Sequence, residues 1–372
     1  MAETQEDRTT REKSQDTGRN ERTSEGRTDA GKVAKGTGRN ERTSDAGDRP
    51  RRLNHRKSVP GETGSVERST PVNSPAARGL TAEGMHRSAF TPRDWALFIG
   101  PAVIWGTSFL FIAEGLETLK PGVVTFGRML FGFLTLALFP AARTPIPRHE
   151  WKRIAAVSIT WLAFPMTLFP IAQQHVSSSL AGMLNGGIPI FVAIVATMLL
   201  RRLPGRAQRI GLGVGVVGIV LIGVPTVSEG KSSAFGVLLV IIAIASYGVA
   251  TNLAVPLTQT YGSVPIFWRC QLLSLALTAP FGAWGLGDST FAWRPVGAVI
   301  LLGVFGTASA FVMMTELGAR VGSTRSSAVT YVEAIFALGI GVAVRHDKVV
   351  SVQLIGCAVL IAGAWLASRA DP

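Results

Sequence analysis

Residues 121–128 read PGVVTFGR, and a related stretch, GSVPIFWR, follows at residues 262–269. Aligning the two places Arg128 opposite Arg269, at a separation of 141 positions. Two further matches, at a separation of 145, join IPIFVA (188–193) to EAIFAL (from Glu333) and QRIG (208–211) to QLIG (353–356). The second part of the chain therefore repeats the first.

Between these stretches the chain alternates apolar runs with short charged or turn-rich breaks. A run of roughly twenty residues crosses the ~30 Å hydrocarbon core of a bilayer as an α-helix, at ~1.5 Å per residue. About ten such spans follow, at residues 95–114, 121–140, 151–171, 176–199, 208–226, 234–254, 264–285, 296–317, 323–344 and 351–368. Because a barrel would need alternating strands of ~10 residues, the sequence predicts an all-α, polytopic membrane protein.

The repeat and the spans together predict the architecture. Five spans lie in residues 95–226 and five in residues 234–372. An odd number of spans per unit gives the two units opposite orientations in the membrane. Two inverted five-helix repeats are typical of carriers that alternate access about a site near the bilayer midplane.

Basic residues in the loops predict the orientation. The loops after the second and fourth spans hold two clusters, which are Arg143, Arg148, Lys152 and Arg153, and Arg201, Arg202, Arg206 and Arg209. The first, third and fifth loops hold only Lys120 and Lys231. The positive-inside rule then places both termini in the cytoplasm, for a multi-pass protein of the plasma or inner membrane. Arg345 and Lys348 would face outward, against the rule.

The first 94 residues differ in composition from the rest. They hold 19 of the 37 Lys and Arg residues, and no aromatic residue precedes Phe90. A segment so poor in apolar side chains cannot offset the entropy of ordering, so we expect a disordered, basic cytoplasmic tail. We interpret its duplicated TGRNERTS (17–24 and 37–44) as low-complexity duplication. The cluster of Arg51, Arg52, Arg56 and Lys57 would suit anionic lipid, and translation from Met85 is a further hypothesis.

Several stretches resemble the EamA-type repeats of the drug/metabolite transporter superfamily. They are WGTSFLFIAEGLETLKPGVVTFGRMLFG, AQQHVSSSLAGMLNGGIPIFVA, and YVEAIFALGIGVAV with QLIGCAVLIAGAWLA. The resemblance covers residues 95–372, and it implies a ten-helix carrier that moves small organic metabolites, often outward. Members commonly carry an acidic residue just after the fourth and ninth helices, where this chain has Arg202 and Asp347. The inner loop of the first repeat is therefore expected to be anchored differently.

Glu333 is the acidic residue within the predicted spans that matters most for a site. It lies ten residues past Ser323, which is roughly 15 Å along a helix and near the bilayer centre. A charge there costs about 2.5 to 3.5 kcal/mol, so the side chain should face a cavity or a partner. Arg128 and Arg269 are candidate partners, and a structural ion pair is as good an interpretation as a binding site. An unpaired Glu333 would be a candidate proton acceptor for coupled transport.

The sequence opposite Glu333 in the first repeat is LNGGIPIF, with Ile188 at the matching position. Gly186, Gly187 and Pro189 predict an interruption of the fourth helix, which would place Asn185 near a ligand. A kink that serves packing is the alternative. Tyr331, two residues before Glu333, would add an aromatic hydroxyl at similar depth.

Four polar or aromatic residues of the first and sixth spans are further candidates for the cavity, namely Trp105, Ser108, Tyr247 and Asn252. An aromatic ring with a polar tip suits an amphipathic solute, but Ser and Asn also bond neighbouring helices together. Arg128 could bind a carboxylate or phosphate through its fork of donors. We interpret Arg269, between Trp268 and Cys270, as a structural charge.

Other motifs indicate little. GVGVVG (213–218) lies within a span, where small residues serve helix packing. GLGD (285–288) would need a second aspartate in a neighbouring span to form a protease site, and the sequence has none within a span. The histidines are dispersed, Cys270 and Cys357 lie in apolar runs, and no Walker lysine motif occurs. We expect no metal, no cofactor and no nucleic-acid partner.

The leading hypothesis is a secondary carrier of a small organic solute, an exporter of amino-acid-like or drug-like compounds, and not an enzyme. Two alternatives are a membrane-embedded enzyme that acts on a lipid-like substrate and a scaffold that does not transport. The repeat favours transport, because alternating access needs symmetry and an enzyme does not. Glycine-rich helices at 211–223 and 356–363 could pair, and a homodimer is open.

Overall fold

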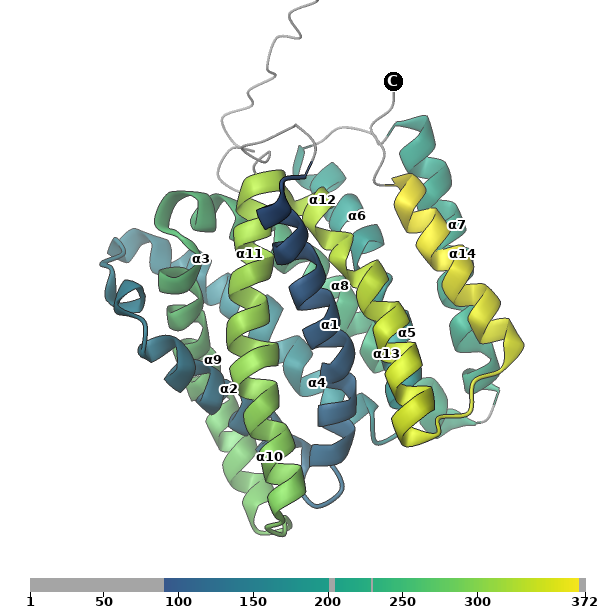
Figure 1. Ribbon diagram of the computed structural model, residues 1–372, viewed down its shortest axis with the longest axis horizontal. Coiled ribbons are helices and arrows are strands. Elements are labelled where there is room, and N and C mark those ends of the chain that lie inside the picture. The colour runs from purple at the N-terminus through teal and green to yellow at the C-terminus, as the bar shows by residue number, and fades with distance from the viewer. Residues whose placement is uncertain (1–89, 201–204, 229, 368–372) are drawn as a thin grey trace, which may run out of the picture. The chain divides into compact units, whose positions relative to one another are not determined.

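The computed structural model describes residues 90–200, 205–228 and 230–367. The described residues form helices joined by short loops, with no strand among them (Figure 1). Within the described residues, eight helices are long and apolar enough to cross a membrane, and Pro121–Ala137 and Ser351–Ala367 are shorter apolar helices. The prediction of an all-α membrane protein with about ten spans is confirmed. Residues 1–89 of the tail, with Met85, and Arg201 and Arg202 lie outside the described residues. The predicted end of the tail at residue 94 was wrong, because α1 already begins at Pro92 with Thr91 as its cap.

The elements follow in the order α1 (Pro92–Gly115), α2 (Pro121–Ala137), η1 (Pro140–Arg143), η2 (Arg148–Glu150), α3 (Trp151–Val157), η3 (Ser158–Ala163), α4 (Phe164–Ala172), α5 (Ser178–Asn185), α6 (Ile188–Leu200), α7 (Arg206–Val227), α8 (Lys231–Tyr261), α9 (Ser263–Leu286), α10 (Trp293–Leu301), η4 (Leu302–Ser309), α11 (Ala310–Val321), α12 (Ser323–Ser327), α13 (Val329–Arg345) and α14 (Ser351–Ala367). Four predicted spans are composite. The third is α3, η3 and α4, the fourth is α5 and α6, the eighth is α10, η4 and α11, and the ninth is α12 and α13.

Several predicted boundaries differ from the structure by three residues or more, and two of these differences have a plain cause. The second span was predicted to reach residue 140, but α2 ends at Ala137 and Pro140 opens the short helix η1. The sixth span was predicted to end at 254, but α8 continues to Tyr261. The last turns of α8 hold Thr258, Gln259 and Thr260, which lower the hydropathy without interrupting the backbone hydrogen bonds of the helix.

The packing of the helices repeats between the two halves. α13 of the second half packs against α1 of the first half, and α6 of the first half packs against α8 of the second half. The helices α2 and α9 pack against each other, as do α7 and α14, which run side by side in Figure 1. The third span contacts α8 just as the eighth contacts α1. These contacts of one half thus have counterparts in the other, as inverted repeats require.

Two π-helical segments occupy matching places in the halves. η3 interrupts the third span and η4 interrupts the eighth. A π-helical turn frees carbonyl groups from the regular ladder and is common at functional sites. Here side chains of other helices take up such carbonyls. Ser246 donates to Thr160 O at 2.7 Å, and Trp105 donates to Gly306 O at 2.9 Å.

Glycines bring α7 and α14 into close contact. A Cβ on Gly218 would lie 2.5 Å from the backbone nitrogen of Leu360, and one on Gly363 would lie 2.3 Å from that of Gly215. Only residues without side chains allow this approach. The glycine faces considered for a homodimer therefore cover each other inside the chain, and they do not support an interface between chains.

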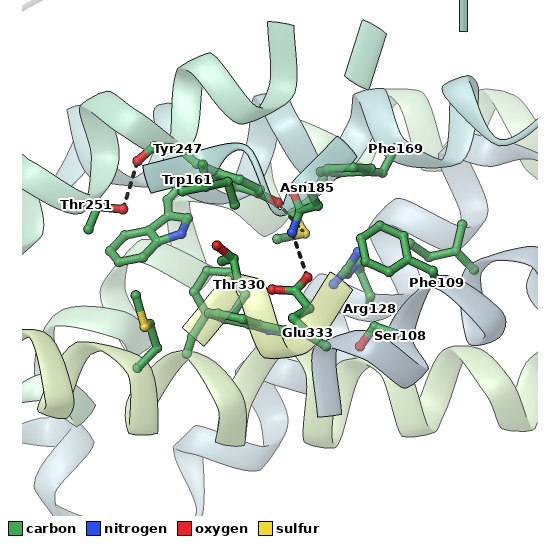
Figure 2. A pocket seen from close by; sticks show the side chains of 16 residues that line it. Ser108, Phe109, Arg128, Trp161, Phe169, Asn185, Tyr247, Thr251, Thr330 and Glu333 are labelled. Atoms are coloured by element: carbon green, nitrogen blue, oxygen red, sulfur yellow. Dashed lines mark hydrogen bonds between the residues drawn. The ribbon is translucent and has the colours of Figure 1, made fainter. Parts of the chain in front are cut away.

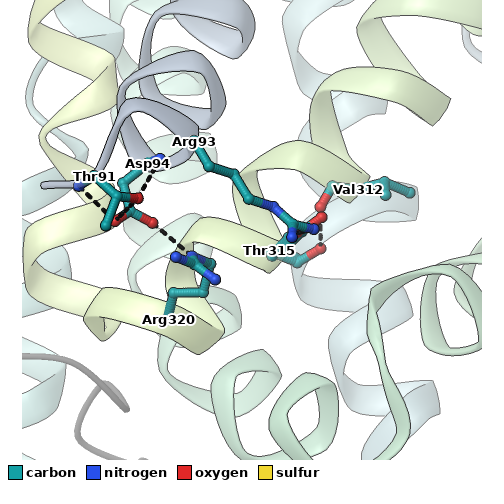
Figure 3. A network of polar contacts seen from close by, with 7 residues as sticks. Thr91, Arg93, Asp94, Val312, Thr315 and Arg320 are labelled. Carbon is teal, nitrogen blue, oxygen red and sulfur yellow. Dashed lines mark hydrogen bonds and ion pairs between the residues drawn. The ribbon is translucent and has the colours of Figure 1, made fainter.

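Ion pairs hold both ends of α1 to helices of the second half. At its start, Thr91 and Asp94 form a capping box, Asp94 pairs with Arg320, and Arg93 pairs with Glu316 (Figure 3).

At the far end of α1, Glu114 pairs with Arg345 at 3.1 Å and with Arg294 at 2.7 Å, and Glu117 pairs with Arg345 at 2.7 Å. Arg345 was the exception to the positive-inside pattern. Two carboxylates neutralise its charge, Glu114 in the last turn of α1 and Glu117 just after it, which accounts for its place.

Asp347, the acidic residue after the ninth helix, joins α13 to the fourth span. Its Oδ2 accepts hydrogen bonds from Ser178 Oγ and from the backbone nitrogen of Ser179, each at 2.8 Å. These groups belong to the first turn of α5, where a carboxylate satisfies amide donors that have no partner within the helix.

Candidate functional site

A cavity lies between the two halves, at the middle of the spans. Its walls come from α1, α2, η3, α4, α5, α6, α8, α11 and α13 (Figure 2), and the space not filled by atoms, including the part open to solvent, is about 520 Å³. The lining consists of Trp105, Ser108, Phe109, Ile112, Arg128, Trp161, Met166, Phe169, Asn185, Ile188, Tyr247, Thr251, Phe311, Met314, Thr330 and Glu333. Sites for small molecules have similar walls, mostly apolar with a few polar groups.

Glu333 enters the cavity from α13 and is 1% exposed. Its Oε1 accepts a hydrogen bond from Asn185 Nδ2 at 2.6 Å (Figure 2). Its Oε2 is buried without a hydrogen-bond partner, as is the Oδ1 of Asn185. Two neighbouring acceptors therefore lack a donor.

Arg128 enters the same cavity from α2 and is 2% exposed. Its Nε donates to Thr307 Oγ1 in η4 at 3.1 Å. Among the described residues, no acceptor is found for its two terminal nitrogens. Neither Arg128 nor Arg269 forms an ion pair with Glu333 in the described part of the chain. The structural ion pair considered for Glu333 is therefore not formed.

A tight turn interrupts the fourth span where LNGGIPIF predicts it. α5 ends at Asn185, α6 begins at Ile188, and the nitrogens of Gly186 and Gly187 bond to the carbonyls of Met183 and Leu184. The turn is a narrow helical one and not an unwound segment, so it frees few backbone groups. It sets Asn185 and Ile188 into the cavity, and Pro189 follows in the first turn of α6.

The aromatic and hydroxyl candidates of α1 and α8 line the cavity with their polar atoms already bonded. Trp105 donates to Gly306 O, and Ser108 donates to the carbonyl of Ile104 in its own helix. The hydroxyl of Tyr247 points to Met166 Sδ at 3.6 Å, and its ring stacks on Phe169. Trp105 and Tyr247 can therefore contact a ligand with the faces and edges of their rings, but the donors of all three side chains are already used.

Tyr331, Asn252 and Arg269 do not line this cavity. Tyr331 is buried in α13 with its hydroxyl unbonded. Asn252 donates to Val192 O and Gly248 O and accepts from Ser323, so it ties α8 to α6 and α12.

Arg269 donates to the carbonyls of Ala142, Thr144 and Pro265, at 3.1, 2.7 and 3.0 Å. It therefore anchors the segment after α2 to α9. The two arginines aligned by the repeat have different surroundings, since Arg128 faces the cavity and Arg269 faces backbone carbonyls.

Sequence reasoning missed the aromatic and sulfur-bearing walls, such as Phe109, Trp161, Phe169, Phe311 and Met314. In an apolar helix nothing in the residue type tells a side chain that faces a cavity from one that faces lipid. A partial signal was the pairing of Thr330 and Glu333, three residues apart and hence on one face of α13.

The comparisons with known proteins agree with this architecture. The EamA-like transporter family matches residues 95–224 and again residues 234–369. The chain belongs to the EamA-like transporter family. The resemblance noted in the motifs is thereby confirmed, and the protein is a membrane transporter of the drug/metabolite type.

Relatives carry names of the same kind. A WAT1-related chloroplastic protein of Arabidopsis thaliana is 25% identical over 290 residues, covering 73% of this chain and 69% of that protein. A protein of Synechocystis sp., named an uncharacterized transporter, is 25% identical over 305 residues, covering 75% of this chain and 91% of the other. A protein of known crystal structure superposes with a TM-score of 0.52 at 17% identity, over 74% of this chain and 96% of its own.

Proposed function

We propose that this transporter carries a small zwitterionic solute of the amino-acid type, by alternating access, through the cavity that holds Glu333 and Arg128. One observation supports this most. A buried carboxylate and a buried guanidinium line one cavity without pairing with each other, and each has hydrogen-bonding atoms left over.

The carboxylate end of the cavity suits an ammonium group. Glu333 Oε2 and Asn185 Oδ1 are acceptors without donors, and an ammonium group has three donors and no acceptor. A bound ammonium group would donate to both buried oxygens at once. The gain in free energy is larger than in water, because a buried polar atom without a partner is costly.

The guanidinium end suits a carboxylate. Only the Nε of Arg128 donates to Thr307, so its two terminal nitrogens can each donate to one oxygen of a solute carboxylate. Between the two ends, the rings of Phe109, Phe169 and Tyr247 form an apolar wall for a side chain. A drug-like amphipathic cation that uses Glu333 and the rings alone is the second candidate.

Alternating access rests on the inverted packing. We propose two repeats, which the sequence places at residues 95–226 and 234–372, preceded by a cytoplasmic tail that ends before α1. We place the protein in the plasma membrane with both termini in the cytoplasm, and propose export as the direction. A proton on Glu333 would replace the missing ammonium donor in the empty carrier, which makes proton exchange a natural coupling. Tyr331 and Asn252 are then support for the site and not contacts with solute.

The test is uptake by proteoliposomes of the purified chain. Radiolabelled phenylalanine is compared with phenethylamine, which lacks the carboxylate, and with 3-phenylpropionate, which lacks the amine. We expect phenylalanine to be carried and each single-charge analogue to be carried poorly. Transport of phenethylamine alone would favour the cation alternative, and absence of all three would contradict the proposal.

A further inference from the structure

A second, smaller cavity continues from the central one. It is lined by Trp161, Thr251, Ala254, Val255, Thr258, Met314, Thr315, Gly318 and Ser326, and it contains about 180 Å³ not filled by atoms. Trp161, Thr251 and Met314 line both cavities. The two spaces therefore meet at these three side chains.

The second cavity leads toward one face of the membrane. From Thr251 to Thr258 is seven residues of α8, or about 10 Å along the helix. Thr258 and Gly318 each lie within one turn of the ends of α8 and α11, and Ser326 lies in the short helix α12. Because Arg320 in the same last turn of α11 pairs with Asp94, this is the face at which α1 begins (Figure 3).

The polar lining of this cavity consists of hydroxyl groups whose hydrogens are already used. Thr251 donates to Tyr247 O, Thr258 to Ala254 O, Thr315 to Phe311 O and Ser326 to Ser323 O. Each acceptor belongs to the donor's own helical segment. The hydroxyls therefore do not bind neighbouring helices to one another, which is the structural role that such residues often have.

A hydroxyl with its hydrogen committed still offers oxygen lone pairs. The lining thus presents hydrogen-bond acceptors and no charge, which favours a group rich in donors, such as an ammonium, and disfavours a carboxylate. Gln259, next to Thr258, donates to Ala319 O at 2.9 Å and so joins the last turns of α8 and α11, where the cavity ends.

We propose that this second cavity is a solute subsite that receives the ammonium end, on the route between the central cavity and the membrane face at which α1 begins. The proposal rests on the proposed function for the chemistry of the solute. The solute enters or leaves amine first, so its ammonium group passes through the subsite ahead of its carboxylate. Trp161 and Met314 must move aside for it to pass.

The test uses single cysteines in a chain with Cys270→Ala and Cys357→Ala. Thr258→Cys and Ser326→Cys report on the subsite. Thr260→Cys is the matched control, since Thr260 lies two residues further along α8 and is exposed. A charged, membrane-impermeant methanethiosulfonate reagent is added to one side of proteoliposomes at a time.

We expect Thr258→Cys and Ser326→Cys to react only from the face at which α1 begins, and modification to stop phenylalanine uptake. Phenylalanine or phenethylamine should slow the reaction of Thr258→Cys severalfold and leave that of Thr260→Cys unchanged. Failure of both subsite cysteines to react in a protein that carries phenylalanine would overturn the proposal. Slowing by sodium chloride alone would also overturn it, because the subsite would then hold an inorganic cation.

A second variant separates the subsite from the central site. Thr258→Val keeps the shape and removes the acceptor, so we expect uptake to slow about tenfold, with Thr260→Val unchanged. Protection by phenethylamine without phenylalanine transport would support the subsite while contradicting the zwitterion proposal. Phenylalanine transport with no effect at Thr258 would contradict the subsite alone.

Discussion

Glu333 shows at the scale of one residue how stability and function oppose each other. Its carboxyl group is buried in the middle of the spans, receives one hydrogen bond and has an oxygen with none. A charge in such a place lowers the stability of the empty protein. The group is tolerable only if something else, such as a solute or a proton, satisfies it for part of the cycle.

We therefore predict that Glu333→Gln abolishes uptake of phenylalanine while the protein unfolds at the same or a higher temperature. The substitution removes a buried charge and keeps the shape of the side chain. Uptake by proteoliposomes and thermal unfolding in detergent measure the two effects.

Glu114→Gln is the control, because Glu114 is also buried but pairs with Arg345 and Arg294. This variant should lose roughly 1 to 3 kcal/mol of stability, since its partners lose a charged acceptor. A marked loss of stability in Glu333→Gln would show that Glu333 is structural and contradict the prediction.

The two arginines aligned by the repeat give a second prediction. Arg128→Met should reduce uptake of phenylalanine by at least about tenfold, because one charge-assisted contact to the carboxylate is lost. Its stability should change little, since only the bond to Thr307 goes. Phenethylamine should still inhibit the remaining uptake of phenylalanine, because its ammonium group binds at Glu333.

Arg269→Met, in contrast, should lower the unfolding temperature markedly. Three carbonyls, of Ala142, Thr144 and Pro265, would lose their donor, and the segment after α2 would detach from α9. Equal behaviour of the two variants in both assays would mean that Arg128, too, serves only the scaffold.

At the scale of helices, the lengths of the apolar runs and the positions of the repeat were enough to predict the spans. The predicted end of a span was wrong where the apolar run stops before the helix does, as at Thr258 to Tyr261 of α8. Positions in the cavity were predictable where a residue is out of place in lipid, as are Glu333, Arg128 and Asn185. They were not predictable for Phe169 or Trp161, because the rotation of an apolar helix about its axis is set by packing with other helices.

The pair formed by α7 and α14 gives a prediction at this scale. Gly218→Ala would push a methyl group against the backbone of Leu360, and we expect a loss of about 1 to 3 kcal/mol in stability. Gly213→Ala, on the open side of the same helix, should instead stabilise by about 0.5 to 1 kcal/mol. Thermal unfolding distinguishes them, and equal losses would mean that α7 is not held as described.

At the scale of the whole molecule, contacts divide the helices differently from the repeats. α1 packs mainly on α13, α11 and α10, whereas α8 packs mainly on α6 and α4 and less on α11, α7 and η3. The hydrogen bonds of Asp347 to Ser178 and Ser179 then link the two groups of helices at one end. The ion pair of Asp94 and Arg320 lies within one group.

Cross-linking tests this division. In the chain without native cysteines, a short bifunctional thiol reagent joining Ser178→Cys to Asp347→Cys should stop transport, because alternating access must separate these residues. The same reagent joining Asp94→Cys to Arg320→Cys should leave most transport intact. The reverse result, or inhibition by both links, would show that α1 moves with its own repeat. Cleavage of the link by a reductant should restore uptake.

The ion pairs at both ends of α1 have a consequence for the folding of the two repeats. The segment that was copied and the segment that moves are not the same, since each copy lends its first helix to the other. Two half-chains made separately would each lack the helix that completes their bundle. Neither half-chain should fold stably alone, and transport should be recovered only when the two are produced together.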